Sequence, residues 1–174
     1  LPYDNKNEFQ IVVDMPEGTT LDRTDAVARR LAAYLGDVAE VRDFTVFSGI
    51  ASPMDFNGMV RHYFLRSGPH VADIRVNLAD KHYREQRSHE ILLRIRDDLQ
   101  QIGDQAGADI KLVEVPPGPP VLATITAEVY GPQGSDYASM IAQARRVAAR
   151  LAREPGIVDV DTSAQDDQVR WVFE

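Results

Sequence analysis

The sequence predicts an α+β fold built from ferredoxin-like split βαβ units, and three observations lead to this class. Strand-like segments alternate with segments of helical periodicity along the chain. Two strand–helix–strand patterns follow one another within residues 1–120, and a third begins after a proline-rich stretch. Two consecutive patterns of this kind form a four-stranded antiparallel sheet with two helices on one face (βαββαβ).

The first pattern begins with the β-favouring run Glu8–Asp14, which a Met-Pro-Glu-Gly turn ends. Thr20 is predicted to cap a helix, and Gly36 stands where that helix would close. Residues 41–47 supply the second strand. The apolar positions that recur at helical spacing are Thr24, Val27, Ala28, Leu31, Tyr34 and Leu35.

The second pattern starts at residues 71–80, where apolar and polar side chains alternate as in a half-buried strand. Ser88 is predicted to cap the next helix and Gly103 to close it. Residues 109–115 form the last strand of this pattern. The apolar stripe of the helix consists of Ile91, Leu92, Ile95, Leu99 and Ile102.

Residues 116–120 (PPGPP) form a stiff linker, because proline fixes φ and lacks the N–H that a helix or central strand needs. A third pattern follows, with strands predicted at 124–130 and 157–161. The helix between them carries Tyr137, Ile141, Ala144, Ala148 and Leu151.

The third pattern repeats the first at one constant offset, which carries Val13 to Val129, Pro16 to Pro132 and Gly18 to Gly134. We therefore predict one complete βαββαβ domain over residues 1–120 and the first half (βαββ) of a second domain over 121–174, truncated at its end. The start at Leu1 and the end within a strand-like run indicate a piece of a longer protein, whose targeting and membrane segments lie elsewhere.

Composition excludes several functions. The net charge of −8 over 174 residues leaves no basic stripe for nucleic acid, so no nucleic-acid partner is expected. The absence of cysteine removes disulfides, thiol catalysis and thiolate metal sites. No apolar stretch approaches the roughly 18 residues that span a bilayer.

Catalytic signatures are lacking as well. The serines have no nucleophile-elbow context, and no glycine-rich loop would cradle a phosphate. The four histidines have no metal-ligand spacing and are interpreted as solvated. Met54 and Met59 are soft enough for Cu(I), but a role in the core or against a ligand is favoured. We predict no enzyme activity, no cofactor and no metal site.

The segment Ser48–Arg66 is the most informative part of the sequence, because it places Ile50, Met54, Phe56 and Met59 in an irregular loop between strands. So much apolar area must cover a core, meet a partner or contact a ligand. A loop that folds back on its own sheet, or a hairpin extension, is the alternative. Asp14, Glu17 and Asp43 are interpreted as ordinary solvated or capping carboxylates.

Two runs resemble a known family. LPYDNKNEFQIVVDMPEGTTLDRTDAVARRLAAYL is similar to the stretch after the seventh transmembrane helix of resistance-nodulation-division (RND) efflux pumps, and AREPGIVDVDTS resembles the matching part of the next subdomain. The resemblance implies a porter subdomain over about residues 1–120 and the opening of a second one over 121–174. It also implies a proton-driven pump in a bacterial inner membrane, with this region periplasmic and the proton relay outside the chain.

By the same resemblance the 48–66 segment occupies the place of the family's switch loop, although it is more polar than versions rich in Gly and Phe. The substrate-binding residues expected from it are Phe47, Ile50, Met54, Phe56, Met59 and Tyr63. The expected partners are a small-molecule substrate, the other protomers of a homotrimer, a periplasmic adaptor and an outer-membrane channel. A soluble ferredoxin-like regulatory module that binds a small ligand is the alternative function.

Overall fold

The structure is a computed structural model that describes residues 5–60, 62, 65–115, 123, 125–164 and 172, without the side chains of Phe56 and Asn57. The chain divides into two compact units, Leu1–Leu122 and Ala123–Glu174. They are called unit 1 and unit 2 below, and each is described by itself.

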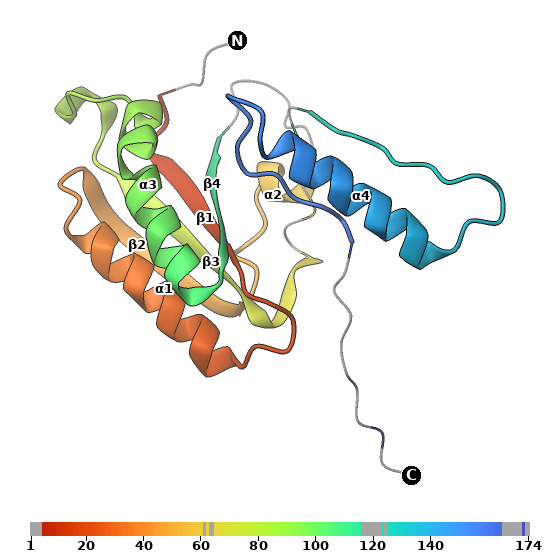
Figure 1. The fold of residues 1–174 in the computed structure, drawn as a ribbon. Coiled ribbons are helices and arrows are strands. Elements are labelled where there is room, and N and C mark those ends of the chain that lie inside the picture. Colours follow the sequence, from red (N-terminus) through yellow and green to blue (C-terminus); the bar gives the residue numbers. More distant parts are fainter. Residues whose placement is uncertain are drawn as a thin grey trace. The chain divides into compact units, whose positions relative to one another are not determined.

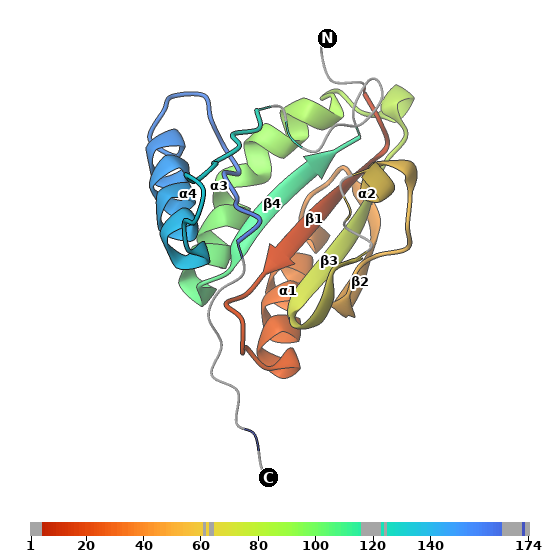
Figure 2. The same ribbon diagram turned by 90° about the vertical axis from the view of Figure 1, so that its right-hand side faces the viewer.

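Unit 1 contains a four-stranded antiparallel sheet. Its strands are β1 (Glu8–Asp14), β2 (Val41–Ile50), β3 (Ser67–Leu78) and β4 (Asp109–Glu114). They lie in the order β2-β3-β1-β4, and Figure 2 shows them side by side in front of the long helices. Every neighbouring pair is antiparallel, with β1 and β3 in the centre. This order and the βαββαβ succession confirm the predicted ferredoxin-like α+β fold.

Two long helices cross one face of this sheet (Figure 1). They are α1 (Leu21–Gly36) and α3 (Ser88–Ala106); the remaining helical elements of unit 1 are the short α2 (Phe56–Val60) and the single turn η2 (Lys81–Tyr83). The core lies between helices and sheet, where Ile11 of β1, Ile74 of β3 and Leu31 of α1 are completely buried. Burial of each such side chain stabilises the fold by about 1.5–3 kcal/mol. The alternation in the sequence therefore identifies the core face.

The turn between β1 and α1 depends on a glycine. Gly18 has a φ of 88°, a left-handed conformation that side chains disfavour. The backbone N–H and the hydroxyl of Thr19 both donate to the carbonyl of Pro16, at 3.1 and 2.6 Å. Thr20 holds the N-cap position, but its side chain makes no capping hydrogen bond in the described part of the chain. The predicted cap position is therefore confirmed, but the hydrogen bond expected from its side chain is not formed.

The start of α3 also differs from the prediction. Arg87 is the N-cap residue, and Ser88 is the first helical residue. The backbone N–H of Ser88 donates to the side chain of Asn5 at 3.0 Å, and that of Arg87 donates to Glu90 at 2.8 Å. A residue distant in sequence thus satisfies one of the free N–H groups at the start of the helix, and the cap predicted at Ser88 lies one residue earlier, at Arg87.

The end of α3 is a further correction. The helix continues past Gly103 to Ala106, and Gly107 ends it with a left-handed φ of 70°. Gly103 has a packing role instead, since a Cβ built there would overlap Cγ1 of Ile110 and lie 3.1 Å from the carbonyl oxygen of Ala108. Its missing side chain lets α3 approach β4 closely.

Unit 2 contains one regular element among its described residues, the helix α4 (Tyr137–Leu151), which confirms the predicted helix. The carboxylate of Asp136 caps it, accepting a hydrogen bond from the Ser139 backbone N–H at 2.8 Å. Residues 125–130 and 157–161 form no strand, so the strands predicted there are wrong as far as the described residues show.

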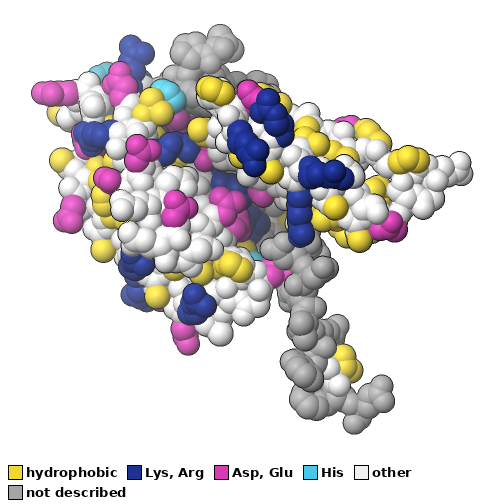
Figure 3. All heavy atoms as spheres, viewed as in Figure 1, with side chains coloured by type: hydrophobic (Ala, Val, Ile, Leu, Met, Phe, Trp, Pro, Cys, Tyr) yellow, Lys and Arg dark blue, Asp and Glu magenta, His cyan; other side chains and the backbone are white. Residues whose placement is uncertain are grey.

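Figure 3 shows both signs of charge interspersed with apolar groups over α1 and α3.

No helix in the described residues is long and apolar enough to cross a membrane.

Candidate functional site

The second face of the unit 1 sheet, opposite the long helices, is polar. Strand register aligns Lys111, Val12, Asp73 and Phe47 across this face from β4 to β2. Asp73 is completely buried and Lys111 is 7 % exposed. Charged side chains at such positions need partners, because an unpaired buried charge is strongly unfavourable. Lys111 is paired with Asp14 and Asp109, and the partners of Asp73 come largely from residues 51–66, called the 51–66 loop below.

The two ends of the 51–66 loop converge on Asp73. Its Oδ2 atom accepts a hydrogen bond from the Ser52 backbone N–H at 2.8 Å, and its Oδ1 atom pairs with the guanidinium of Arg66. The Gln10 side chain of β1 also donates to Oδ2, at 2.9 Å. The Ala51 N–H donates to the Arg66 carbonyl at 3.1 Å, which closes the loop at its neck. The carboxylate of Asp73 thus binds both ends of the 51–66 loop.

Arg66 extends this network to Asp14. Its second guanidinium nitrogen lies 2.6 Å from Asp14 Oδ1 and donates to the Val13 carbonyl at 2.9 Å. The ammonium of Lys111 lies 3.0 Å from Asp14 Oδ2. Asp14 is therefore a doubly paired member of a partly buried ionic network, and its interpretation as an ordinary solvated carboxylate is wrong. The sequence pattern did not reveal this, because Arg66 and Lys111 are distant along the chain.

The charge of Asp14 contributes to stability in a pH-dependent way. Burial raises the pKa of this carboxyl. The nearby charges and hydrogen bonds of Arg66 and Lys111 lower the pKa by more than burial raises it, so the net pKa lies below the ordinary 3.8. A pKa lower in the folded than in the unfolded state gives stability that is present above the unfolded pKa. That stability is lost as the pH falls through the folded pKa.

We therefore expect the free energy of unfolding to fall between about pH 6 and about pH 2 by more in the wild type than in Asp14→Asn. Urea titrations at a series of pH values measure both slopes. Equal slopes in the two proteins would contradict this assignment.

The tip of the 51–66 loop is attached separately, by Arg75 of β3. The guanidinium of Arg75 lies 2.6 Å from Asp55 Oδ2, and it also donates to the Ser52 hydroxyl at 3.0 Å and to the Pro53 carbonyl at 3.2 Å. The other oxygen of Asp55 accepts the Gly58 N–H at 2.6 Å, at the start of α2. The loop is thus folded back over its own sheet, the alternative that the sequence left open.

The predicted substrate-binding residues fall into three groups. Phe47 lies on the polar face of β2 and is half-buried. Ile50, Met54 and Met59 are exposed by 55, 62 and 42 %, so they present apolar surface although the loop beneath them is anchored. Phe56 begins α2, but its side chain, like the whole of Tyr63, lies outside the described residues. The sequence analysis missed Asp73 and Arg66, the residues that anchor the loop. The sequence feature that could have revealed them is a charged residue within a largely apolar strand (Asp73) or just before it (Arg66).

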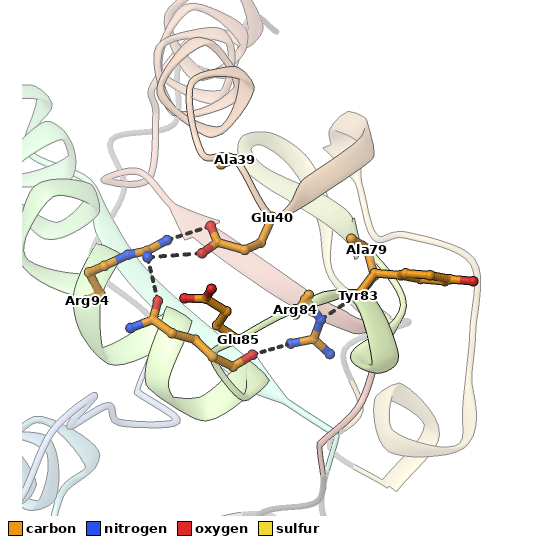
Figure 4. A pocket seen from close by; sticks show the side chains of 8 residues that line it. Ala39, Glu40, Ala79, Tyr83, Arg84, Glu85 and Arg94 are labelled. Carbon is orange, nitrogen blue, oxygen red and sulfur yellow. Dashed lines mark hydrogen bonds and ion pairs between the residues drawn. The ribbon is translucent and has the colours of Figure 1, made fainter.

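A hollow of about 390 Å³ lies at the end of the sheet, beside the segment that connects β3 to α3 (Figure 4). Arg94 makes a two-pronged contact with Glu40, at 3.0 and 2.6 Å. Arg84 donates to the carbonyls of Ala79 and Gln86, at 2.7 and 3.1 Å. Both guanidinium groups are engaged by other residues of the protein, so the contacts around this hollow stabilise the fold. The 51–66 loop is therefore the better candidate site.

The comparisons with known proteins bear on this loop-bearing domain. The model of the AcrB/AcrD/AcrF family matches residues 1–172. The chain belongs to the AcrB/AcrD/AcrF family. The RND resemblance in the sequence is thereby confirmed, and the family is one of efflux transporters.

A solved structure supports the AcrB-like fold. The chain is similar to the X-ray crystal structure of a heavy metal efflux pump, with a TM-score of 0.61 and 18 % sequence identity. The match covers 91 % of this chain and 16 % of that pump, so the chain spans about a sixth of the pump's length. No curated protein gives a significant match. At this identity the likeness establishes the fold alone, and the substrate of that pump is not carried over to this chain.

Proposed function

We propose that this AcrB/AcrD/AcrF-family chain is the porter region of a proton-driven RND pump that exports small molecules. In this proposal residues 1–120 form one porter subdomain, and 121–174 form the first half of a second. The region lies in the periplasm, and the whole pump resides in a bacterial inner membrane. The proposed partners are two further protomers of a homotrimer, a periplasmic adaptor and an outer-membrane channel. The proton relay belongs to other parts of the pump.

The observation that carries the site is the exposed apolar surface formed by the 51–66 loop and by Ile50, the last residue of β2. A loop without function would be expected to turn apolar side chains inward, yet Ile50 and Met54 are each more than half exposed. At the same time the neck of the loop is fixed by the buried Asp73. A fixed base with a pliable thioether surface suits the contact of varied apolar molecules, because methionine adapts its shape to different ligands.

The neighbourhood of this surface favours uncharged regions of a substrate. The carboxylate of Asp55 lies next to Met54 in sequence and is paired with Arg75. The charges under the neck of the loop are paired with one another. A substrate that lies on Met54 and Met59 therefore meets thioether and aliphatic carbon, and its affinity comes from the removal of apolar area from water.

The test is dye export by cells that carry the whole pump, with N-phenyl-1-naphthylamine as an uncharged apolar probe. Met54→Ser and Met59→Ser together are expected to reduce the export rate by about three- to tenfold, the effect of losing part of the burial of two methionines. Tyr83→Ser is the matched control, because Tyr83 is 89 % exposed and lines the hollow near Arg84 instead of the loop.

Export that is unchanged in the double methionine variant, with normal amounts of pump in the membrane, would exclude the 51–66 loop as a substrate surface. An equal loss in Tyr83→Ser would show that the effect is not specific to the loop.

A further inference from the structure

Two attachments of unequal burial hold the 51–66 loop on the sheet. At the neck, Asp73 has a side chain that is 0 % exposed, and its partner Arg66 is 15 % exposed. At the tip, the paired side chains of Arg75 and Asp55 are 22 and 35 % exposed. Water reaches the second pair more readily, so its ions can be solvated when they separate. The neck ions would be left unsolvated in the protein, at a much larger cost.

The remaining contacts of each group sharpen this difference. If Asp55 leaves, Arg75 still has the Ser52 hydroxyl and the Pro53 carbonyl as acceptors, at 3.0 and 3.2 Å. If Asp73 lost its loop partners, the side chain of Gln10 would be the donor left to its buried charge within the described part of the chain. The tip can therefore detach without stranding a buried charge, whereas the neck cannot.

Asp55 also joins the attachment to the helix that carries the apolar surface. Its Oδ1 atom accepts the Gly58 N–H at 2.6 Å, and its carbonyl accepts the Met59 N–H at 2.9 Å. A Cβ at Gly58 would stand 3.0 Å from Asp55 Oδ1, so the absence of a side chain there permits this tight turn. Asp55 and the start of α2 consequently move as one piece.

We propose that the Asp55–Arg75 ion pair is the positioning device of the loop tip, and that the tip is released at this pair while Asp73 holds the neck as a pivot. Asp55 and Arg75 are positioning residues for the surface formed by Met54 and Met59. The functional meaning of the release rests on the proposed function of that surface. The mechanical statement stands on the geometry of unit 1.

The absence of native cysteine makes a spin-label distance measurement clean. Labels at Met59→Cys on α2 and Leu93→Cys on α3 report the distance between the tip and a fixed helix of the same unit, and Leu93 is 56 % exposed. In the 174-residue chain, Arg75→Gln removes the partly exposed ion pair and the guanidinium hydrogen bonds to Ser52 and Pro53. It is expected to increase the population of displaced tip by about two- to fivefold. Asp55→Ala should give a similar increase.

Asp43→Ala is the matched control, because it removes an exposed carboxylate from the same face, where it pairs with Arg42 and Asn77. Its distance distribution should match that of the parent. Near-ultraviolet circular dichroism verifies that each variant stays folded. A broadening in Asp55→Ala alone would overturn the proposal, since the lost Gly58 hydrogen bond would then be the cause, and an unchanged distribution in Arg75→Gln would overturn it directly.

The same variants separate this inference from the proposed function. A displaced tip in Arg75→Gln, combined with normal dye export in the methionine variants, supports the release point and refutes the substrate surface. An unmoved tip combined with reduced export in the methionine variants refutes the release point and supports the substrate surface.

Discussion

Replacement of Asp73 by alanine is expected to lower the free energy of unfolding of unit 1 by about 3–5 kcal/mol, the range for removal of one partner from a buried ion pair. Three donors each lose one acceptor at once: the Ser52 backbone N–H, the Gln10 amide and the Arg66 guanidinium. Since domains are stable by only about 5–15 kcal/mol, the loss is a large fraction of the total. Urea unfolding followed by circular dichroism measures it.

Two comparisons make the Asp73 result specific. Asp73→Asn keeps one carbonyl oxygen in place and is expected to lose less stability than Asp73→Ala, because part of the hydrogen bonding survives. Asp43→Ala, on the same face but at its exposed part, should leave the urea midpoint nearly unchanged. A midpoint of Asp73→Ala close to that of the wild type would show that the network adds nothing to the stability of the fold.

Gly103→Ala is expected to lower the free energy of unfolding by about 1–3 kcal/mol through overpacking. The new Cβ would overlap Cγ1 of Ile110 on β4, and the carbonyl oxygen of Ala108 at 3.1 Å limits the room for adjustment. Alanine is favoured over glycine in a helix by about 1 kcal/mol. The measured loss of unfolding free energy is therefore the cost of the clash minus this gain in helix propensity. The same urea titration measures the difference.

Gly36→Ala is the matched control for this substitution. Gly36 ends α1, nothing lies within 4 Å of the position that a Cβ would take there, and its φ lies outside the left-handed region. The change should be neutral or stabilise by up to about 1 kcal/mol, because it restricts the unfolded chain without a clash. If Gly103→Ala proved as harmless as Gly36→Ala, the close approach of α3 to β4 would not constrain the fold.

Local pattern sufficed for the four strands and the two long helices of unit 1, but it did not predict α2 or η2. The β-favouring run at Glu8–Asp14 became β1 with the same bounds, and the apolar stripe from Ile91 to Leu99 became the buried face of α3. Both signals repeat within a few residues, at the period of the structure that they form. The end of α3 was misread because Gly103 and Gly107 are equivalent as sequence signals, and only packing against Ile110 separates a contact glycine from a capping one.

The candidate site was predicted in part. The 48–66 segment was identified from its apolar residues, and Ile50, Met54 and Met59 are exposed on it. Its anchors were not identified, and Asp14 was interpreted as solvated. Sequence distance explains the failure, since Asp14 meets Arg66 and Lys111 only after β1, β3 and β4 have paired. No local periodicity encodes such a meeting.

The sequence by itself determined the succession of strands and helices, which side chains face the core of unit 1, and the family. These features follow from periodicity and turn chemistry, which act over short stretches of chain. The tertiary structure alone decided that Asp73 receives both limbs of the 51–66 loop and that Arg75 holds its tip. It also decided that the described segments flanking α4 remain without strands. Each of these outcomes depends on which distant residue becomes a neighbour, and a buried charge or an unpaired strand is stable only when that neighbour is present.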